Sequence, residues 1–177
     1  MKKLIVILIA VTGLTLNACK KLEKLTEFYL DYNASVTVPA NMGINLPFDI
    51  LTPDITTNYE EQFSANDTRK DMVDEIKMAG MNLTVKAPQG QNLDFLKSIN
   101  VFISADGLPE KEIASKNNIP DGLSVLELDY ASDNLKEYVM KDKIKLRVKT
   151  VTDKALNQNV DLDVKTRFFV NAKILGA

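Results

Sequence analysis

The chain has 177 residues, a common length for one domain once a leader is removed. It is 45% hydrophobic and 26% charged, a composition typical of globular proteins that excludes a disordered chain. The formal net charge is −2 and becomes −4 if Lys2 and Lys3 leave with a leader, so the chain lacks the basic surplus typical of nucleic-acid-binding proteins. The absence of histidine removes the usual neutral-pH general base and the commonest transition-metal ligand.

Residues 1–18 have the three-part pattern of a secretory leader. Lys2 and Lys3 precede an apolar run at residues 4–11, and Ala18 is a small residue at the end of the segment. The run is shorter than the roughly 20 residues that cross a bilayer. We therefore expect the leader to be cleaved rather than kept as a membrane span.

The leader is followed by Cys19, which is the only cysteine of the chain and so cannot form an internal disulfide. Leu16, Asn17, Ala18 and Cys19 resemble a bacterial lipobox, which has Leu three residues before the cysteine and a small residue directly before it. The resemblance implies that Cys19 becomes the first mature residue and carries a diacylglyceryl group on its sulfur, usually with an amide-linked acyl chain. Two or three chains anchor a protein firmly, because each buried methylene contributes about 0.8 kcal/mol. The alternative is an unmodified cysteine in an ordinary signal peptide or a short hydrophobic anchor.

Residues 19–25 are predicted to form a charged tether between the lipid and the domain. Lys20 and Lys21 add attraction to anionic head groups. The Asn- and Lys-rich composition resembles that of Bacteroidota lipoproteins, whose surface-exported members tend to carry acidic residues after the cysteine. Because these positions are basic here, we expect an anchor in the outer membrane, with the domain facing the periplasm.

Residues 26–177 are predicted to form a single β-rich domain. Apolar and polar residues alternate over residues 28–38 with the period of two of a half-buried strand. Residues 46–53 predict a second strand. Because Pro47 and Pro53 lack a backbone donor, this strand is expected at a sheet edge or a bulge.

A helical period appears in residues 64–80. Apolar residues fall at i, i+1, i+4 and i+7 from Met72, and Gly80 follows as a stop signal, so we expect an amphipathic helix of about three turns capped by Ser64 or Asn66. The acidic side chains of the segment lack the alternate spacing of an EF-hand loop, so we assign them to a solvated helix face rather than to a metal site. They are Asp67, Asp71, Asp74 and Glu75.

The middle of the chain predicts two strands and a long loop. Residues 81–87 and 99–105 read as strands, with one helical turn at residues 93–96 capped by Asn92 between them. Residues 106–122 contain two Asp-Gly pairs and two prolines and predict the longest irregular stretch. Because loops on a rigid scaffold carry most binding sites, this loop is the predicted functional surface, with a plain connection as the alternative.

A further strand and a second helix are expected after this loop. Residues 125–130 alternate as a strand. Ser132 or Asp133 is placed to cap a short helix that ends near Val139.

Two alternating runs at residues 143–151 and 159–170 are predicted to pair as an antiparallel hairpin. Exposed charge pairs across such a hairpin contribute only about 0.2 to 1 kcal/mol each, but they fix its register. The expected cross-strand pairs are Lys149 with Asp161, Arg147 with Asp163, and Val148 with Leu162.

The pattern as a whole predicts a mainly β fold, an antiparallel β-sandwich or barrel-like sheet with two short helices inserted. The sequence contains no Gly-rich phosphate loop, no Ser-centred nucleophile elbow and no Cys/His metal spacing. We therefore expect no enzyme activity and no cofactor.

Two hypotheses of function follow. The first is a non-catalytic binding or structural module of the cell envelope, anchored in the membrane through Cys19, with an envelope protein or component as partner and no nucleic acid. The alternative is a periplasmic carrier of a lipid or other apolar ligand, with the predicted helix as a lid. Its cavity would be lined by Phe95, Phe102, Phe168 and Phe169, where one ring of the adjacent pair should point outward.

Overall fold

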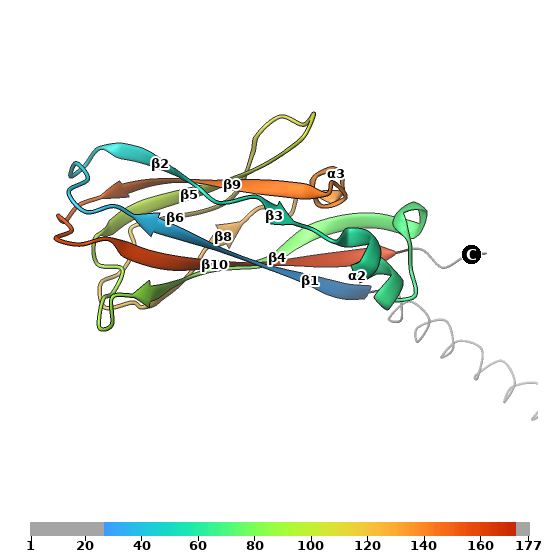
Figure 1. Cartoon of the computed structure of the whole chain (residues 1–177), viewed down its shortest axis with the longest axis horizontal. Coiled ribbons are helices and arrows are strands. Elements are labelled where there is room, and N and C mark those ends of the chain that lie inside the picture. The colour runs from blue at the N-terminus through green and yellow to red at the C-terminus, as the bar shows by residue number, and fades with distance from the viewer. Residues whose placement is uncertain (1–26, 173–177) are drawn as a thin grey trace, which may run out of the picture.

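Two antiparallel sheets packed face to face form the body of the protein (Figure 1), in a computed structural model that describes residues 27–172. The four-stranded sheet has the order β1 (Glu27–Val38), β10 (Val160–Ala172), β4 (Val73–Ala87) and β7 (Val125–Glu127). The six-stranded sheet contains β2 (Pro47–Leu51), β9 (Lys143–Thr152), β5 (Leu96–Ala105), β6 (Lys111–Asn117) and β8 (Asp129–Tyr130), with β3 (Ile55–Thr56) also paired to β9. Two short helices, α2 (Tyr59–Ala65) and α3 (Lys136–Val139), are inserted, together with a 3-10 turn η2 (Lys70–Met72). The predicted sandwich with two short helices is confirmed.

Alternating side chains of both sheets form the core between them. In β1 the buried positions include Leu30, Tyr32 and Val36, and β10 buries every second residue from Val160 to Ala172. Except for the polar Thr166, these side chains belong to one cluster of buried apolar residues. A fully buried aliphatic or aromatic side chain contributes roughly 1.5 to 3 kcal/mol, so the period of two that identifies the strands is also what stabilises the sandwich.

The predicted edge strand is also confirmed. β2 begins at Pro47 and lies at the edge of the six-stranded sheet, with β9 as its only neighbour among the described strands. A proline lacks the donor that a second neighbour would need, which explains the position.

The helix predicted over residues 64–80 is wrong, because residues 73–80 belong to strand β4 and residues 66–69 are not helical. β-Bulges opposite β10 insert one extra residue into β4 at Asp74 and another at Ala79. Each bulge adds a residue, so buried side chains from Val73 onward are spaced by three, two, three and two instead of by two throughout. This uneven spacing imitates a helical period.

The predicted hairpin of residues 143–151 and 159–170 is wrong as well, since β9 and β10 belong to different sheets. Both strands have one apolar face, and these faces pack toward each other across the sandwich instead of lying side by side. The connection at residues 153–159 is held by Leu156, which is buried. The proposed charge pairs are therefore not formed. Arg147 bonds to Asp49 and Glu110, and Asp163 accepts hydrogen bonds from Ser35 and Lys86.

The long loop predicted at residues 106–122 contains a strand. β6 pairs with both β5 and β8, and it buries Ile113 and Ala114. With only two buried side chains, β6 has too little apolar alternation for its pattern to be recognised. The predicted functional surface is thus divided, with residues 106–110 before the strand and residues 118–122 after it.

Smaller differences concern the neighbouring segments. The predicted strand at residues 125–130 is divided between the two sheets, as β7 and β8. Residues 93–96 form a turn that opens β5, not a helix, and Asn92 Oδ1 accepts the N–H of Asp94 there. The second helix is α3, as expected, but Asn134 Oδ1 accepts the N–H of Lys136 at its start.

The sandwich is elongated and its two ends differ (Figure 1). We call the left-hand end in the figure the loop end, defined by residues 39–46, 88–95, 118–124 and 153–159. The right-hand end is the helix end, defined by residues 57–72, 106–110 and 131–142, which include α2, η2 and α3. β1 starts at the helix end and runs to the loop end, so the chain enters the sandwich at the helix end.

Candidate functional site

The one site residue predicted from sequence, Cys19, lies outside the described residues, as do the rest of the leader and the tether. Two surfaces of the described sandwich are candidates for binding. One is the loop end, and the other is a groove beside β1.

The first and last loops of the loop end are joined by hydrogen bonds. The N–H of Asn41 donates to the carbonyl of Leu156 at 3.1 Å, and the N–H of Asn45 donates to Thr152 at 2.6 Å. The N–H of Ala40 also donates to Asn159 Oδ1 at 2.9 Å. Residues 39–46 are therefore fixed to the connection between β9 and β10.

The two middle loops are joined in the same way. The N–H of Leu93 donates to the carbonyl of Leu123 at 2.8 Å, and Asp94 Oδ1 accepts the N–H of Gly122. The N–H of Asp153 donates to Phe95 at 3.1 Å and links this pair of loops to the other pair. Because backbone groups make these bonds, the loops are held in shape before any partner arrives.

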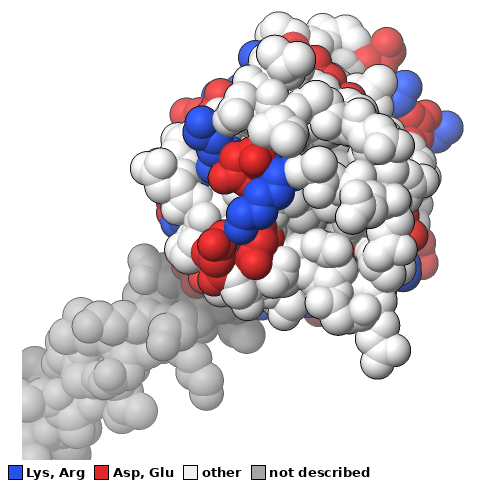
Figure 2. Space-filling view, turned by 90° about the vertical axis from the view of Figure 1, so that its left-hand side faces the viewer, with Lys and Arg blue, Asp and Glu red and all other residues white. Residues whose placement is uncertain are grey.

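The loop end has few charges and many amides. Of its thirty residues, nine are Asn or Gln and four are charged, the latter being Asp94, Asp121, Asp153 and Lys154. Figure 2 shows this face as mostly uncharged, with charged atoms gathered in a narrow strip. Two large apolar side chains of the first loop are exposed, Ile44 at 46% and Leu46 at 63%.

The loop end contains an exposed ion pair. Lys154 Nζ lies 3.1 Å from Asp121 Oδ1, and this hydrogen bond raises the pKa of the Lys154 amine above its ordinary value. The charges of this face are thus partly compensated. A neutral partner that forms hydrogen bonds fits such a face better than a strongly charged one.

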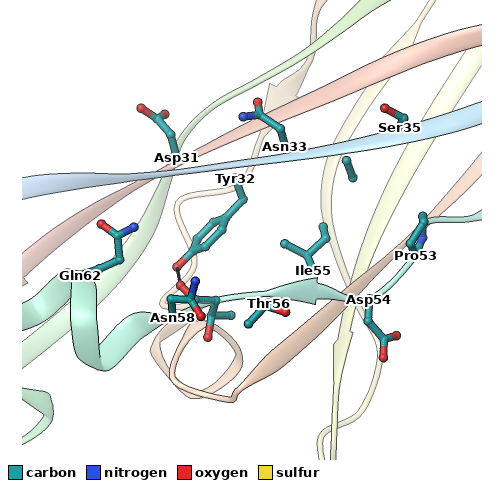
Figure 3. A pocket seen from close by; sticks show the side chains of 12 residues that line it. Asp31, Tyr32, Asn33, Ser35, Pro53, Asp54, Ile55, Thr56, Asn58 and Gln62 are labelled. Carbon is teal, nitrogen blue, oxygen red and sulfur yellow. Dashed lines mark hydrogen bonds between the residues drawn. The ribbon is translucent and has the colours of Figure 1, made fainter.

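The second candidate is a groove of about 550 Å³ between the edge strands of the two sheets (Figure 3). Residues 31–35 of β1 line one wall, and residues 53–58 and Gln62 line the other. In the figure Tyr32 extends from β1 across the groove toward Asn58, while Ile55 lies on β3 below. The groove therefore marks the open side of the sandwich, where β1 and β3 approach but do not pair.

Tyr32 connects the two walls. Its hydroxyl donates a hydrogen bond of 2.9 Å to the backbone carbonyl of Thr57. Burial raises the pKa of Tyr32 to about 12, because the ionised phenolate would lose its hydration. Tyr32 therefore stays protonated at neutral pH and acts as a structural donor.

Both carboxylates of the groove are already paired with cations. Asp31 accepts two hydrogen bonds from Arg167 at 2.8 and 2.9 Å, which hold the pKa of Asp31 below its ordinary value. Asp54 lies 3.1 Å from Lys145 Nζ and 3.6 Å from Lys143 Nζ, and the hydrogen bond with Lys145 is the main cause of its lowered pKa. The groove is thus polar but has a balanced charge.

The four phenylalanines expected to line a carrier cavity do not meet in one. Phe95 and Phe168 are buried in the core. Phe102 lies under the guanidinium of Arg147, 4.1 Å from its central carbon, and Phe169 packs against exposed Tyr29 with ring centroids 5.7 Å apart. The expected lid is part of β4, so this part of the carrier hypothesis is wrong. The expectation that one of the two adjacent rings points outward is confirmed by Phe169, and β10 keeps its alternation without a bulge of its own.

Within residues 27–172, no three acidic side chains gather in an arrangement that could hold a metal ion. No helix of this part of the chain is long and apolar enough to cross a membrane.

Sequence reasoning missed the groove and found only part of the loop end, because residues 118–122 of that end belong to the loop predicted as the functional surface. The groove lies between β1 and residues 53–58. No local sequence pattern indicates that two edge strands of different sheets face each other. The loop end was partly visible, because Gly and Asn residues mark each of its loops. The signal that could have identified it is the shift from charged to amide side chains in these loops.

No family model and no curated protein matches the chain. Distant solved structures include a Desmodium yellow mottle tymovirus protein, with 9% identity, 85% of each chain covered and a TM-score of 0.33. Another is CpGH89CBM32-5 from Clostridium perfringens, with 10% identity, 75% of this chain and 94% of that chain covered, and a TM-score of 0.33. The protein FlhE shares 8% identity over 84% of this chain and 98% of its own, with a TM-score of 0.31. At these scores the matches carry no argument about function.

Proposed function

We propose that the protein is a lipid-anchored, non-catalytic binding domain of the cell envelope, attached through Cys19 and presenting its loop end to a partner. The observation that carries the proposal is the position of the only cysteine. Cys19 follows a leader with a lipobox-like end and stands eight residues before Glu27, the first residue of β1.

The path of the chain leaves the loop end free of the tether. Eight extended residues reach about 28 Å at most, and they join the sandwich at the helix end. β1 then spans twelve residues, about 40 Å, to the loop end. The loop end therefore stands well away from the point where the proposed lipid would attach.

The chemistry of the loop end fits a protein or other neutral envelope component as partner. The centre of a protein interface is depleted in charged residues, and the loop end is depleted in the same way. Its loops are already ordered by backbone hydrogen bonds such as that from Asn41 to Leu156, so binding loses little conformational entropy. Exposed Ile44 and Leu46 supply apolar contact area.

A non-catalytic role agrees with the acidic groups of the groove. General acid–base chemistry needs a group whose pKa lies near the working pH. Asp31 and Asp54 have pKa values below the ordinary range because of their cationic neighbours, so both stay ionised at neutral pH. The sequence offers no histidine to replace them.

The proposed location is the outer membrane, with the domain in the periplasm. It is supported by the basic residues Lys20 and Lys21 directly after the cysteine. Positive charge at this position also favours contact with anionic head groups.

The anchor is tested by Cys19→Ala. We expect this variant to leave the membrane fraction and to lose labelling with radioactive palmitate. Thr12→Ala, which changes the leader outside the lipobox-like residues, is the matched control and should fractionate and label normally. Unchanged fractionation and labelling of Cys19→Ala would contradict the proposal.

A further inference from the structure

The strands at the outer edges of the two sheets differ greatly in length. β2 has five residues, β7 three, and β3 and β8 two each, and β2 also begins with Pro47. β1 has twelve residues, and its register with β10 continues from Glu27 to Val38 without a bulge. Natural proteins protect sheet edges with short strands, proline, lysine or bulges. β1 contains none of these four devices.

The outer edge of β1 is not paired with a strand, although β2 and β3 approach it. β10 is the only strand paired with β1 in the described part of the chain, and within that part no backbone–backbone hydrogen bond from a turn or loop reaches residues 27–38. In an antiparallel pair, every second residue of an edge strand directs both its N–H and its C=O away from its neighbour. β1 therefore presents a row of alternating donors and acceptors.

The groove runs along this edge and not over one face of the sheet. Five consecutive residues of β1, 31–35, line it, so residues that point to both faces of the sheet border the same space (Figure 3). Five strand residues span about 17 Å, which is the length of an ordinary strand. A strand that is added to β1 has room in the groove.

The walls of the groove define what such a strand must look like. Tyr32, Ala34 and Ile55 lie on its inner side and are buried or half-buried. Asp31 and Asp54 are compensated by their cations, so the groove offers no free charge to attract a small ion. The matching occupant is a neutral extended segment that points small apolar side chains inward and polar ones outward.

We propose that an extended segment of a partner polypeptide pairs antiparallel with β1 in this groove and lengthens the four-stranded sheet by one strand. Only a polypeptide backbone repeats donors and acceptors at the spacing of the β1 edge, and strand addition of this kind gives affinity through the main chain. The proposal concerns a second surface beyond the loop end and does not depend on acylation of Cys19.

The probe is a fluorescein-labelled seven-residue peptide of alternating Thr and Val with blocked ends, and the protein is the full chain in detergent. We expect saturable binding by fluorescence anisotropy. Two further peptides carry N-methyl groups on either the Val or the Thr amides. When the Val side chains face inward, the amides of either the Val or the Thr residues face β1, and the other set faces away. The peptide methylated on the amides that face β1 should bind at least ten-fold more weakly. The other methylated peptide should bind normally.

On the protein, Asn33→Lys places a charge on the free edge and should weaken peptide binding at least ten-fold. Thr84→Lys is the matched control, because Thr84 is equally exposed on the same sheet but lies on β4, which is paired on both sides. It should bind the peptide normally. Absence of saturable binding, equal loss with both methylated peptides, or equal loss in both variants would overturn the proposal. A dimer that dissociates in Asn33→Lys would overturn it too, because the edge would then belong to a second copy.

Discussion

The two ends of the sandwich are closed in different ways. At the helix end, α2 buries Tyr59 and Phe63, and α3 buries Tyr138 and Val139. At the loop end, Leu93, Phe95 and Leu156 are buried, and hydrogen bonds between loops, as between Asn41 and Leu156, join the four segments. Thirteen of the 33 helix-end residues are charged, against four of the thirty at the loop end.

The difference indicates a division of roles between the ends. The helix end closes the space between the sheets with side chains of two short helices, and its surface is rich in charges. The loop end closes the space with loops joined by hydrogen bonds and has a nearly uncharged surface. A surface of this kind is suited to binding.

Phe63→Ala should have the largest effect on stability. Phe63 is 0% exposed and packs edge-on against Phe28 and Tyr59, with ring centroids 6.0 and 5.7 Å away. We expect a loss of about 3 to 5 kcal/mol in the free energy of unfolding, measured by chemical denaturation. Ile44→Ala at the loop end removes an exposed side chain and should change it by less than about 0.5 kcal/mol. Equal losses would erase the distinction between the ends.

Alkaline pH should lower the free energy of unfolding, because Tyr32 ionises. The pKa of Tyr32 is about 12 in the folded protein and about 10 in an unfolded chain, so its contribution is fully present below pH 10 and is lost as the pH rises through 12. The full contribution is about 2 to 3 kcal/mol.

The control for this prediction is Tyr32→Phe, which cannot ionise. It should cost about 1 kcal/mol at neutral pH, because the hydrogen bond to Thr57 is lost. Its free energy of unfolding should then fall less than that of the unchanged protein between pH 10 and 12. Parallel curves would show that Tyr32 does not cause the alkaline loss.

Gly122→Ala tests how far backbone conformation orders the loop end. Gly122 has a φ of 84°, a conformation that side chains disfavour, and we expect a loss of about 1 kcal/mol. Gly80→Ala in β4 is the matched control, since no neighbour lies within 4 Å of an added Cβ and its φ is not positive. Denaturation of both variants should show a loss for Gly122→Ala alone. A similar loss for both would mean that the turn does not depend on this glycine.

Asp121→Asn should have the smallest effect. It removes the exposed ion pair with Lys154, which contributes little to the free energy of unfolding and still less at high salt. Thermal unfolding at low and high salt should show a small difference that disappears as salt is added. A loss of several kcal/mol would mean that charge, and not backbone bonding, orders the loop end.

The sequence predicts features that depend on local pattern. The alternation of residues 28–38 identifies β1, and Pro47 places β2 at an edge. α3 begins close to the position expected from Ser132 or Asp133, where Asn134 Oδ1 accepts the N–H of Lys136. Each of these depends on neighbours in the chain, which a sequence displays directly.

Features that depend on distant neighbours are not predictable in this way. The bulges at Asp74 and Ala79 form only because β4 pairs with β10. They change the spacing of the apolar residues, so that the strand has a sequence pattern similar to that of a helix. The apolar alternation of β9 and β10 is equally compatible with a hairpin and with two facing sheets. The groove beside β1 has the same origin, because residues 31–35 and 53–58 meet only after both sheets have formed.

The central claim is that the loop end, and not the helix end, meets the partner. It is tested most directly by placing a photo-crosslinking amino acid at exposed Gln158 of the loop end or at exposed Glu137 of the helix end and irradiating intact cells that make the full chain. The account predicts a discrete cross-linked product from position 158 and none from position 137. A product from position 137 alone, or equal products from both positions, would contradict it.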